Sequence, residues 1–534
     1  MIRPPALTLL AVLVAAAPLA AQLPPVKEHT LSNGLRVLLV ERRDDPTIAC
    51  GWMARVGSVN ERPGITGLAH LFEHMMFKGT KTIGTRDAKR DAELNAAQDR
   101  VQAQIREEMD QLRDRQRRGE IANFQDPAVR TPRLQGLLDQ FDALVKEQRS
   151  LVVKDEIWTI YAGAGGTGMN ASTSQDVTQY IVTIPANKLE LWAWLESDRL
   201  ANPVFREFYS ERNVVLEERK QTLESRPGGL VSEAFNAMTW TAHPYHWQVI
   251  GWPSDISQVT REQANEFFAT YYAPNNITAI LVGDFKAEQA LPVLERYFGR
   301  IPANPKGVPP VITQEPAQPA EQRMVAEVET SPAVEAVFKT VAGVHKDAPA
   351  LQVLASVLSG SGGGMMRGGG GGGRASGRLG KSLVLEQKAA LNASAFSRGQ
   401  KYAGTFVLRA TPAPGKRPEE VEPLLYAEVA RIAREGITEA ELERARNAYQ
   451  MAQYARMDNN VAIRSALTAA ESSGTWRDLE EAPKRLMAVT REDVQRVAHQ
   501  YFAQENRSVL ITLRKGAAGP RRRPNAPAAL PEVK

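Results

Sequence analysis

The chain of 534 residues contains a single cysteine, Cys50, and only seven histidines. A lone cysteine excludes an internal disulfide bond. No segment has the roughly 20 consecutive apolar residues that a membrane-spanning helix requires, so we expect no membrane span. The net charge of +5 comes largely from a basic carboxy-terminal tail. Because no basic patch is interleaved with aromatic residues, the sequence does not predict nucleic-acid binding.

The remaining composition is that of a large, exported globular protein, with 43% hydrophobic and 24% charged residues. At the amino terminus, Arg3 precedes an apolar run over residues 6–17 and a series of small residues that ends at Ala21. This order is typical of a cleavable signal peptide, which we place at residues 1–21. We therefore expect the mature chain to begin near Gln22 and to be periplasmic or secreted.

The most informative motif is H-L-F-E-H over residues 70–74. Residues four apart on an α-helix project from the same face, so His70 and His74 could bind one tetrahedral zinc ion. Glu73 flanks that face, where it could accept a proton from a water molecule activated by the metal. The neighbouring apolar residues recur at helical spacing and predict a half-buried helix. These residues are Leu68, Leu71, Phe72, Met75 and Met76.

A catalytic zinc ion requires a third protein ligand, which must come from another part of the chain. The best candidate is a predicted helix in which Glu211 and Glu218 are seven residues apart and share one face. We expect Val214 and Val215, which lie between them, to face the core. Without the two histidines, this stretch would be interpreted as a solvated acidic helix face.

The motif and the distant glutamate pair resemble the inverted-motif zinc peptidases, the family of pitrilysin, insulin-degrading enzyme and mitochondrial processing peptidase. The similarity is greatest to the short bacterial members that resemble processing peptidases. The resemblance implies that His70, His74 and Glu218 bind one Zn²⁺ per chain, that Glu73 is the catalytic base, and that Glu211 supports the site. It also implies a zinc endopeptidase that hydrolyses peptides or unfolded protein segments in a closed chamber.

Residues 168–173 are similar to the strand that lies beside the bound peptide in this family. An exposed edge strand can bind an extended peptide through main-chain hydrogen bonds. The resemblance therefore assigns Asn170 and Ala171 to substrate binding. By contrast, we interpret His243 and His246 as structural, because loop histidines beside proline and aromatic residues often only pack or form hydrogen bonds.

An internal repeat indicates that the chain contains two homologous halves. Residues 259–273 recur as residues 489–503 at a constant offset of 230, and each copy continues into a β-rich run. Between the halves, residues 301–322 are rich in proline and alanine and are typical of a linker. We therefore predict a zinc-binding domain at 22–300, the linker, a homologous domain at 323–514, and a disordered tail at 515–534.

The resemblance implies an α+β fold for each domain, with a mostly antiparallel sheet covered by helices, and implies that the two domains form half of a clamshell. The second half contains no H-x-x-E-H motif. It has Gln450, in a predicted helix with Glu443, at an offset similar to that of Glu218. We expect the second half not to bind zinc.

The first domain contains an additional segment that predicts an inserted helical hairpin at about residues 87–153. His74 and Glu218 are 144 residues apart, a spacing longer than is usual in the family. Two charged, helix-favouring stretches account for most of the difference. Apolar residues recur along the first stretch at intervals near seven, which indicates either packing within the hairpin or a partner surface. These residues are Leu94, Val101, Ile105 and Leu112.

The second half also departs from the family pattern. Catalytic members often have an arginine and a tyrosine seven residues apart that bind the substrate carbonyl, whereas the corresponding positions here are Leu385 and Asn392. Such a contact is worth about 3 kcal/mol. We therefore expect a heterodimer in which a homologous subunit supplies the pair; the alternative assembly is a homodimer. The glycine-rich run from Ser359 to Gly377 could be a flexible entrance to the chamber.

An alternative interpretation is a non-catalytic peptide-binding or scaffold subunit of a peptidase-like hetero-oligomer. The absent arginine and tyrosine favour it. The availability of three zinc ligands beside a potential base argues against it, because structural zinc usually has four protein ligands.

Overall fold

The computed structural model describes residues 24–360 and 376–516. The predicted signal peptide, most of the glycine-rich run and nearly all of the predicted tail lie outside the described residues. None of the helices in these two described ranges is both long enough and apolar enough to cross a membrane.

The first domain contains a six-stranded sheet in the order β1-β2-β6-β3-β5-β4. All neighbouring strands are antiparallel except the parallel pair β2 and β6. The strands are β1 (Val26–Thr30), β2 (Arg36–Glu41), β3 (Thr47–Ala54), β4 (Thr167–Thr173), β5 (Thr178–Pro185) and β6 (Ile277–Gly283). The central strands β3 and β6 are almost entirely buried, as expected for strands covered on both faces.

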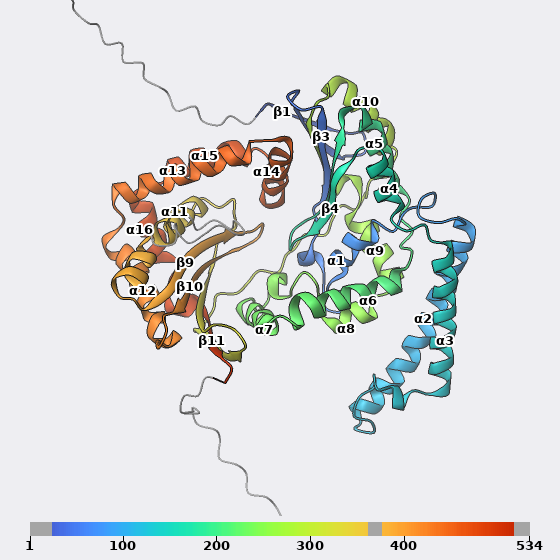
Figure 1. The fold of residues 1–534 in the computed structure, drawn as a ribbon, viewed down its shortest axis with the longest axis horizontal. Helices are drawn as coiled ribbons and strands as arrows, with labels where there is room; N and C mark the ends of the chain where they lie inside the picture. Colours follow the sequence, from blue (N-terminus) through green and yellow to red (C-terminus); the bar gives the residue numbers. More distant parts are fainter. Residues whose placement is uncertain (1–23, 361–375, 517–534) are drawn as a thin grey trace, which may run out of the picture.

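Helices cover this sheet and connect its strands (Figure 1). They are α1 (Leu68–Met75), α4 (Glu156–Gly163), α5 (Leu189–Ala201), α6 (Phe208–Arg219), α8 (Pro253–Gln258), α9 (Arg261–Tyr271) and α10 (Ala287–Phe298), whereas α7 (Gly229–Thr239) packs elsewhere. Their apolar faces and one face of the sheet form one large hydrophobic core, which includes Trp52, Phe72 and Phe267.

The second domain contains a five-stranded sheet in the order β7-β11-β8-β10-β9. Its strands are β7 (Gln322–Val328), β8 (Ala333–Thr340), β9 (Ala390–Gly399), β10 (Gly404–Pro412) and β11 (Arg507–Arg514). Its helices are α11 (Ala348–Ser359), α12 (Pro418–Glu435), α13 (Glu439–Arg456), α14 (Asn460–Ser473), α15 (Asp478–Met487) and α16 (Arg491–Gln500). The predicted linker has no helix or strand until β7 begins at Gln322.

The topology confirms two homologous α+β halves with mostly antiparallel sheets. The order β2-β6-β3-β5-β4 has the same form as β7-β11-β8-β10-β9, and each set contains one parallel pair. Local contacts also recur at the 230-residue offset. Asn276 Nδ2 donates to the carbonyl oxygen of Tyr271 at 2.8 Å, and Asn506 Nδ2 donates to that of Tyr501 at 2.8 Å.

Each half contributes one helix that packs on the sheet of the other half, an arrangement that we call the helix exchange. The apolar side of α7 packs on the second sheet, where Phe235 contacts a cluster that includes Val337, Val407 and Leu510. Reciprocally, α14 packs on the first sheet, in a cluster that includes Leu467 and Ile280. The positions of α7 and α14 differ by about the repeat offset, and Figure 1 shows each helix beside the other half. This exchange joins the two domains through apolar contacts on both sides.

The predicted helical hairpin is present as α2 (Ala88–Arg117) and α3 (Pro132–Leu151). In Figure 1 it extends from the outer side of the first domain, away from the second. Val101, Ile105 and Leu112 pack against Leu134 and Leu137 in a separate small core. The heptad-like spacing therefore reflects packing within the hairpin.

Candidate metal centre

The motif at residues 70–74 lies on α1, as predicted. The chain enters this helix through Gly67, whose φ of 87° is in the left-handed region that favours glycine. The Glu61 carboxylate accepts hydrogen bonds from the backbone N–H groups of Gly67 and Ala69 at 2.9 and 2.7 Å. It therefore satisfies amides that would otherwise lack partners at the helix start.

One side of α1 is buried in the first-domain core through Leu68, Leu71, Phe72 and Met75. The motif residues His70, Glu73 and His74 are only partly buried. The helix therefore directs its polar side chains away from the core, toward α6.

Glu218 on α6 meets both histidines. Its Oε2 atom lies 3.7 Å from His70 Nε2 and 3.4 Å from His74 Nε2. One potential ligand atom from each residue lies within 4.8 Å of the others. In residues 24–360 and 376–516, this is the one group of three or more histidine, cysteine, aspartate or glutamate side chains with such an arrangement.

The chemistry of these atoms fits a zinc ion. Two imidazole nitrogens and a carboxylate oxygen form a ligand set found in catalytic zinc sites. Glu218 Oε2, which faces both rings, is buried without a hydrogen-bond partner in the described part of the chain. An unpaired buried carboxylate oxygen is costly, and a bound cation would compensate its charge.

Glu211 binds the other side of His74. Its Oε1 atom lies 3.0 Å from His74 Nδ1, and its Oε2 atom lies 2.6 Å from Lys78 Nζ. Metal-binding histidines commonly use their second ring nitrogen in this way, because a carboxylate partner fixes the ring orientation. Glu211 therefore supports His74, which leaves His74 Nε2 facing Glu218.

Two neighbouring carboxylates determine the pKa of His74. Burial opposes its protonation, but the hydrogen bond with Glu211 and the nearby carboxylates of Glu211 and Glu218 outweigh burial and raise the pKa of His74 to about 9. The pKa of Glu218 is lowered, chiefly by the contact of its carboxylate with His74. Burial raises the pKa of Glu211, but His74 and Lys78 more than reverse this effect. The surroundings therefore favour the ionised forms of Glu211 and Glu218.

Glu73 lies beside this cluster, one residue before His74. Its side chain is partly exposed, and its carboxylate forms no hydrogen bond or ion pair with any residue in the described ranges. A carboxylate without a competing partner next to the proposed ligands has the arrangement expected of a general base.

Asn170 and Ala171 lie on β4, at the free edge of the first sheet. The hydrogen bond from the Ser174 N–H to the Val177 carbonyl closes the β4–β5 hairpin, so Ala171 falls at a position whose main-chain groups point away from β5. Its N–H instead donates to Asn170 Oδ1 at 2.9 Å. The edge of β4 therefore presents main-chain groups close to α1.

One expectation for α6 is wrong. Val215 is buried as predicted, but Val214 is 49% exposed. Val214 is three residues after Glu211 and four before Glu218, so it shares their helix face and not the face that packs on the core.

His243 and His246 lie away from the metal cluster. His243 is buried, and its Nδ1 accepts a hydrogen bond from the Tyr245 N–H at 3.1 Å. His246 Nδ1 lies 2.6 Å from the Trp240 carbonyl oxygen. Both contacts fit the structural role expected from sequence.

Leu385 and Asn392 lie in the second domain. Leu385 is in a π-helical turn over Gly380–Glu386, and its side chain is 56% exposed. Asn392 lies on β9, the edge strand of the second sheet. Neither side chain can supply the positive charge or phenol that the family resemblance places at these positions.

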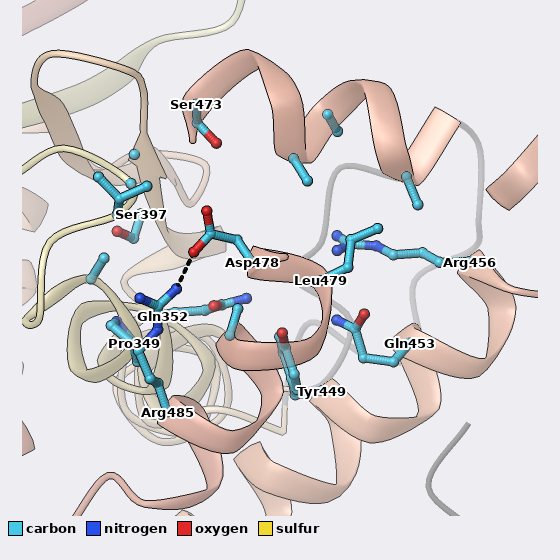
Figure 2. A pocket seen from close by; sticks show the side chains of 18 of the residues that line it. Pro349, Gln352, Ser397, Tyr449, Gln453, Arg456, Ser473, Asp478, Leu479 and Arg485 are labelled. Atoms are coloured by element: carbon cyan, nitrogen blue, oxygen red, sulfur yellow. Dashed lines mark hydrogen bonds and ion pairs between the residues drawn. The ribbon is translucent and has the colours of Figure 1, made fainter. Parts of the chain in front are cut away.

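A cavity of about 620 Å³ lies in the second domain, between α11, α13, α14 and α15 (Figure 2). Because α11 follows β8 as α1 follows β3, this region corresponds to the metal centre of the first domain. Gln352 and Tyr449 line it instead of histidines, and its one acidic residue, Asp478, pairs with Arg485 at 2.8 Å. The cavity therefore lacks the ligands for a comparable zinc site.

Lys78 is the component of the site that the sequence analysis missed. It lies in the turn after α1, which ends at Met75, so helical spacing from His74 does not place its side chain. No sequence signal indicated this residue, because its contact with Glu211 depends on the packing of α1 against α6.

Two family models match the chain. The model described as "Insulinase (Peptidase family M16)" matches residues 36–110, which include the H-x-x-E-H motif. The model described as "Peptidase M16 inactive domain" matches residues 258–449.

The chain is also similar to individual proteins. It is 25% identical over 500 residues to zinc protease PqqE of Helicobacter pylori, covering 92% of this chain and 93% of the relative. A crystal structure of a protease from Helicobacter pylori has a TM-score of 0.71 at 22% identity and covers 92% of this chain and 100% of that chain. The periplasmic protease PqqL from Escherichia coli has a TM-score of 0.65 at 17% identity, with coverage of 91% and 47%, respectively.

Proposed function

The chain belongs to the M16 family of pitrilysin-like peptidases, and we propose that it is a zinc-dependent endopeptidase of peptides or unfolded protein segments. The observation that carries this proposal is the convergence of His70, His74 and Glu218 beside the unpaired carboxylate of Glu73. Relatives named zinc proteases support the same chemistry.

His70, His74 and Glu218 would hold one zinc ion per chain. When bound, zinc supplies a Lewis acid that polarises the scissile carbonyl and lowers the pKa of water. Glu73 accepts a proton from the attacking water while the oxygen of that water forms a bond to the carbonyl carbon. Glu73 then donates the proton to the departing amine as the carbon–nitrogen bond breaks, and returns to its carboxylate form.

Glu211 is a positioning residue in this mechanism. By accepting from His74 Nδ1, it fixes the ring so that Nε2 faces the ligand cluster. Lys78 balances the charge of Glu211 from the opposite side.

The substrate would bind as an additional strand at the edge of β4. The main-chain groups of Ala171 face that edge, and Asn170 can release the Ala171 N–H by rotating its side chain. Main-chain pairing gives affinity with little sequence preference, which suits a peptidase that accepts unfolded segments.

A homologous subunit would complete the site by supplying an arginine and a tyrosine in a heterodimer. Leu385 and Asn392 cannot provide these groups, and a second copy of this chain has the same two residues, so a homodimer would have to work without the pair. The chain spans about half the length of the Escherichia coli PqqL structure, so two units of this size exist in one polypeptide in that relative. The proposed location is the periplasm or the exterior, on the basis of the predicted signal peptide.

The test is to measure zinc content and peptide hydrolysis for the mature chain alone and with a homologous subunit. We expect one zinc ion per chain and hydrolysis that requires assembly. Zinc binding without hydrolysis in every mixture would instead favour the alternative of a non-catalytic peptide-binding subunit, which the exposed Leu385 also suits.

A further inference from the structure

The helical hairpin is attached to the first domain by a buried ion pair. Arg206 Nε lies 2.9 Å from Asp91 Oδ2 on α2, and each side chain is only 1% exposed. Asp91 is held from the second helix as well, because Gln148 on α3 donates to its Oδ1 at 2.8 Å. Both helices of the hairpin therefore contribute to the position of the Arg206 guanidinium.

Arg206 in turn organises the loop that follows α1. Its guanidinium donates to the carbonyl oxygens of Lys78 at 2.6 Å, Thr80 at 3.1 Å and Ile83 at 3.2 Å. A buried guanidinium requires several acceptors, and this loop supplies three of them. The backbone of Lys78 is thus tied to the hairpin through one side chain.

Two glycines allow the loop to approach Arg206 closely. Gly79 and Gly84 have φ values of 94° and 91°. A Cβ atom at these positions would lie 2.9 and 2.7 Å, respectively, from Arg206 Nη1. The loop over residues 78–84 therefore packs closely around the guanidinium. Because three of its carbonyl oxygens accept hydrogen bonds from Arg206, a displacement of Arg206 would also displace the loop.

The start of α6 is also held by the hairpin. Glu207, directly after Arg206, has a φ of 58°, a left-handed conformation that is strained for a non-glycine residue and needs support from its surroundings. Two residues later, the Tyr209 hydroxyl donates to Asp99 on α2 at 2.6 Å. The contacts of Arg206 and Tyr209 with the hairpin therefore lie on either side of Phe208, where α6 begins. Glu211 is in the first turn of this helix.

The two segments held by the hairpin, the loop over residues 78–84 and the start of α6, come together at Glu211. Lys78 reaches it from the loop, with Nζ 2.6 Å from Glu211 Oε2, and Glu211 reaches His74 from α6. We propose that the helical hairpin is a positioning element of the metal centre, which acts through Arg206 and Tyr209 on the Lys78–Glu211–His74 contacts. This inference rests on the proposed function, because it takes His74 to be a zinc ligand.

The experiment measures the zinc dissociation constant of the full mature chain by competition with a chelator of known affinity. Asp91→Asn keeps the shape of the side chain but removes the charge that holds Arg206. Tyr209→Phe removes only the hydroxyl that reaches Asp99. Partners that orient metal ligands change affinity by about 10–100-fold. We expect zinc binding to weaken by about tenfold in Asp91→Asn and by a smaller factor, above twofold, in Tyr209→Phe.

The matched control is Asp110→Asn, on the distal part of α2, where the exposed carboxylate pairs with Arg113. This variant should bind zinc as tightly as the unchanged protein. Urea midpoints of the metal-free proteins separate stability from positioning, because a purely structural contact lowers the midpoint without changing zinc affinity in the folded protein.

Zinc affinity within twofold of the unchanged protein in both Asp91→Asn and Tyr209→Phe would overturn the inference while leaving the proposed function intact. If Asp91→Asn does not fold, Tyr209→Phe decides the matter. Failure of the unchanged protein itself to bind zinc would remove both the proposed function and this inference.

Discussion

The Nδ1 atom of His74 lies 3.0 Å from the Oε1 atom of Glu211, a residue 137 positions further along the chain. This contact fixes the orientation of the imidazole ring and leaves Nε2 toward Glu218. It connects the short motif on α1 with a helix that follows the entire inserted hairpin. The geometry of the centre therefore depends on long-range packing as well as on the motif.

Replacement of Glu211 with glutamine should weaken zinc binding by about 10–100-fold, because the neutral amide holds the His74 ring less firmly than a carboxylate. Competition with a chelator measures this change. Glu217→Gln is the matched control, since Glu217 lies on the same helix with its side chain 56% exposed and should not affect the metal. Equal zinc affinity in the two variants would show that Glu211 does not support the site.

Ala171→Pro should impair substrate binding. The Ala171 N–H faces the free edge of β4, so proline removes a donor available to a substrate strand without removing a hydrogen bond to β5. Loss of one hydrogen bond of about 1.4 kcal/mol corresponds to a tenfold increase in KM. Steady-state kinetics with a peptide substrate would measure it. An unchanged KM in a folded variant would place the substrate elsewhere.

The helix exchange predicts that a single residue of the first domain stabilises the second. Phe235 on α7 is 4% exposed among residues of the second sheet. Phe235→Ala should lower the free energy of unfolding by about 3 kcal/mol, measured by urea denaturation. Leu230→Ala, on the same helix at a site 51% exposed, should change it by no more than about 0.5 kcal/mol. Similar values for both variants would argue against the importance of this contact.

Glu471 on α14 should make the contact between domains sensitive to acid. Its side chain is fully buried, and Oε2 lies 2.6 Å from Arg36 Nη1 on β2. Burial alone would raise the pKa of Glu471, but hydrogen bonds from Arg36 and the Trp476 N–H, together with the charge of Arg55, lower it from the ordinary value of 4.5.

Because the pKa of Glu471 is lower in the folded state, its stabilising contribution is present above the unfolded value of 4.5. It is lost as the pH falls through the folded-state pKa. Glu471→Gln should reduce the free energy of unfolding by about 2 kcal/mol at pH 7, since it removes the charge that pairs with Arg36 and Arg55, while Arg36 keeps its ion pair with Glu28. Urea denaturation should show a smaller difference from the unchanged protein as the pH falls below 4.5. A difference independent of pH would contradict this assignment.

Much of the centre could be predicted from sequence because its elements are local. The spacing of His70 and His74 places both rings on one helix face whatever the surrounding fold. The spacing of Glu211 and Glu218 does the same on a second helix. The repeat near residues 259 and 489 indicated two homologous halves, and the strand orders agree.

Other features depend on contacts that no local pattern contains. The exchange of α7 and α14 follows from how two complete sheets pack, and periodicity within either helix does not indicate which sheet it covers. Val214 was misassigned because its apolar side chain favoured the core, whereas its position on α6 places it on the same face as Glu211 and Glu218. The contact between Lys78 and Glu211 likewise requires the packing of α1 against α6.

The most direct test of the central claim compares peptide hydrolysis by the zinc-loaded mature chain and its Glu73→Gln variant, each assembled with the homologous subunit or as a homodimer. We predict that the variant retains one zinc ion per chain and loses activity by about 10²–10⁴-fold, because it lacks the group that accepts and returns the proton. Equal hydrolysis by the two proteins, with zinc bound to both, would contradict the assignment of Glu73 and the mechanism built on it.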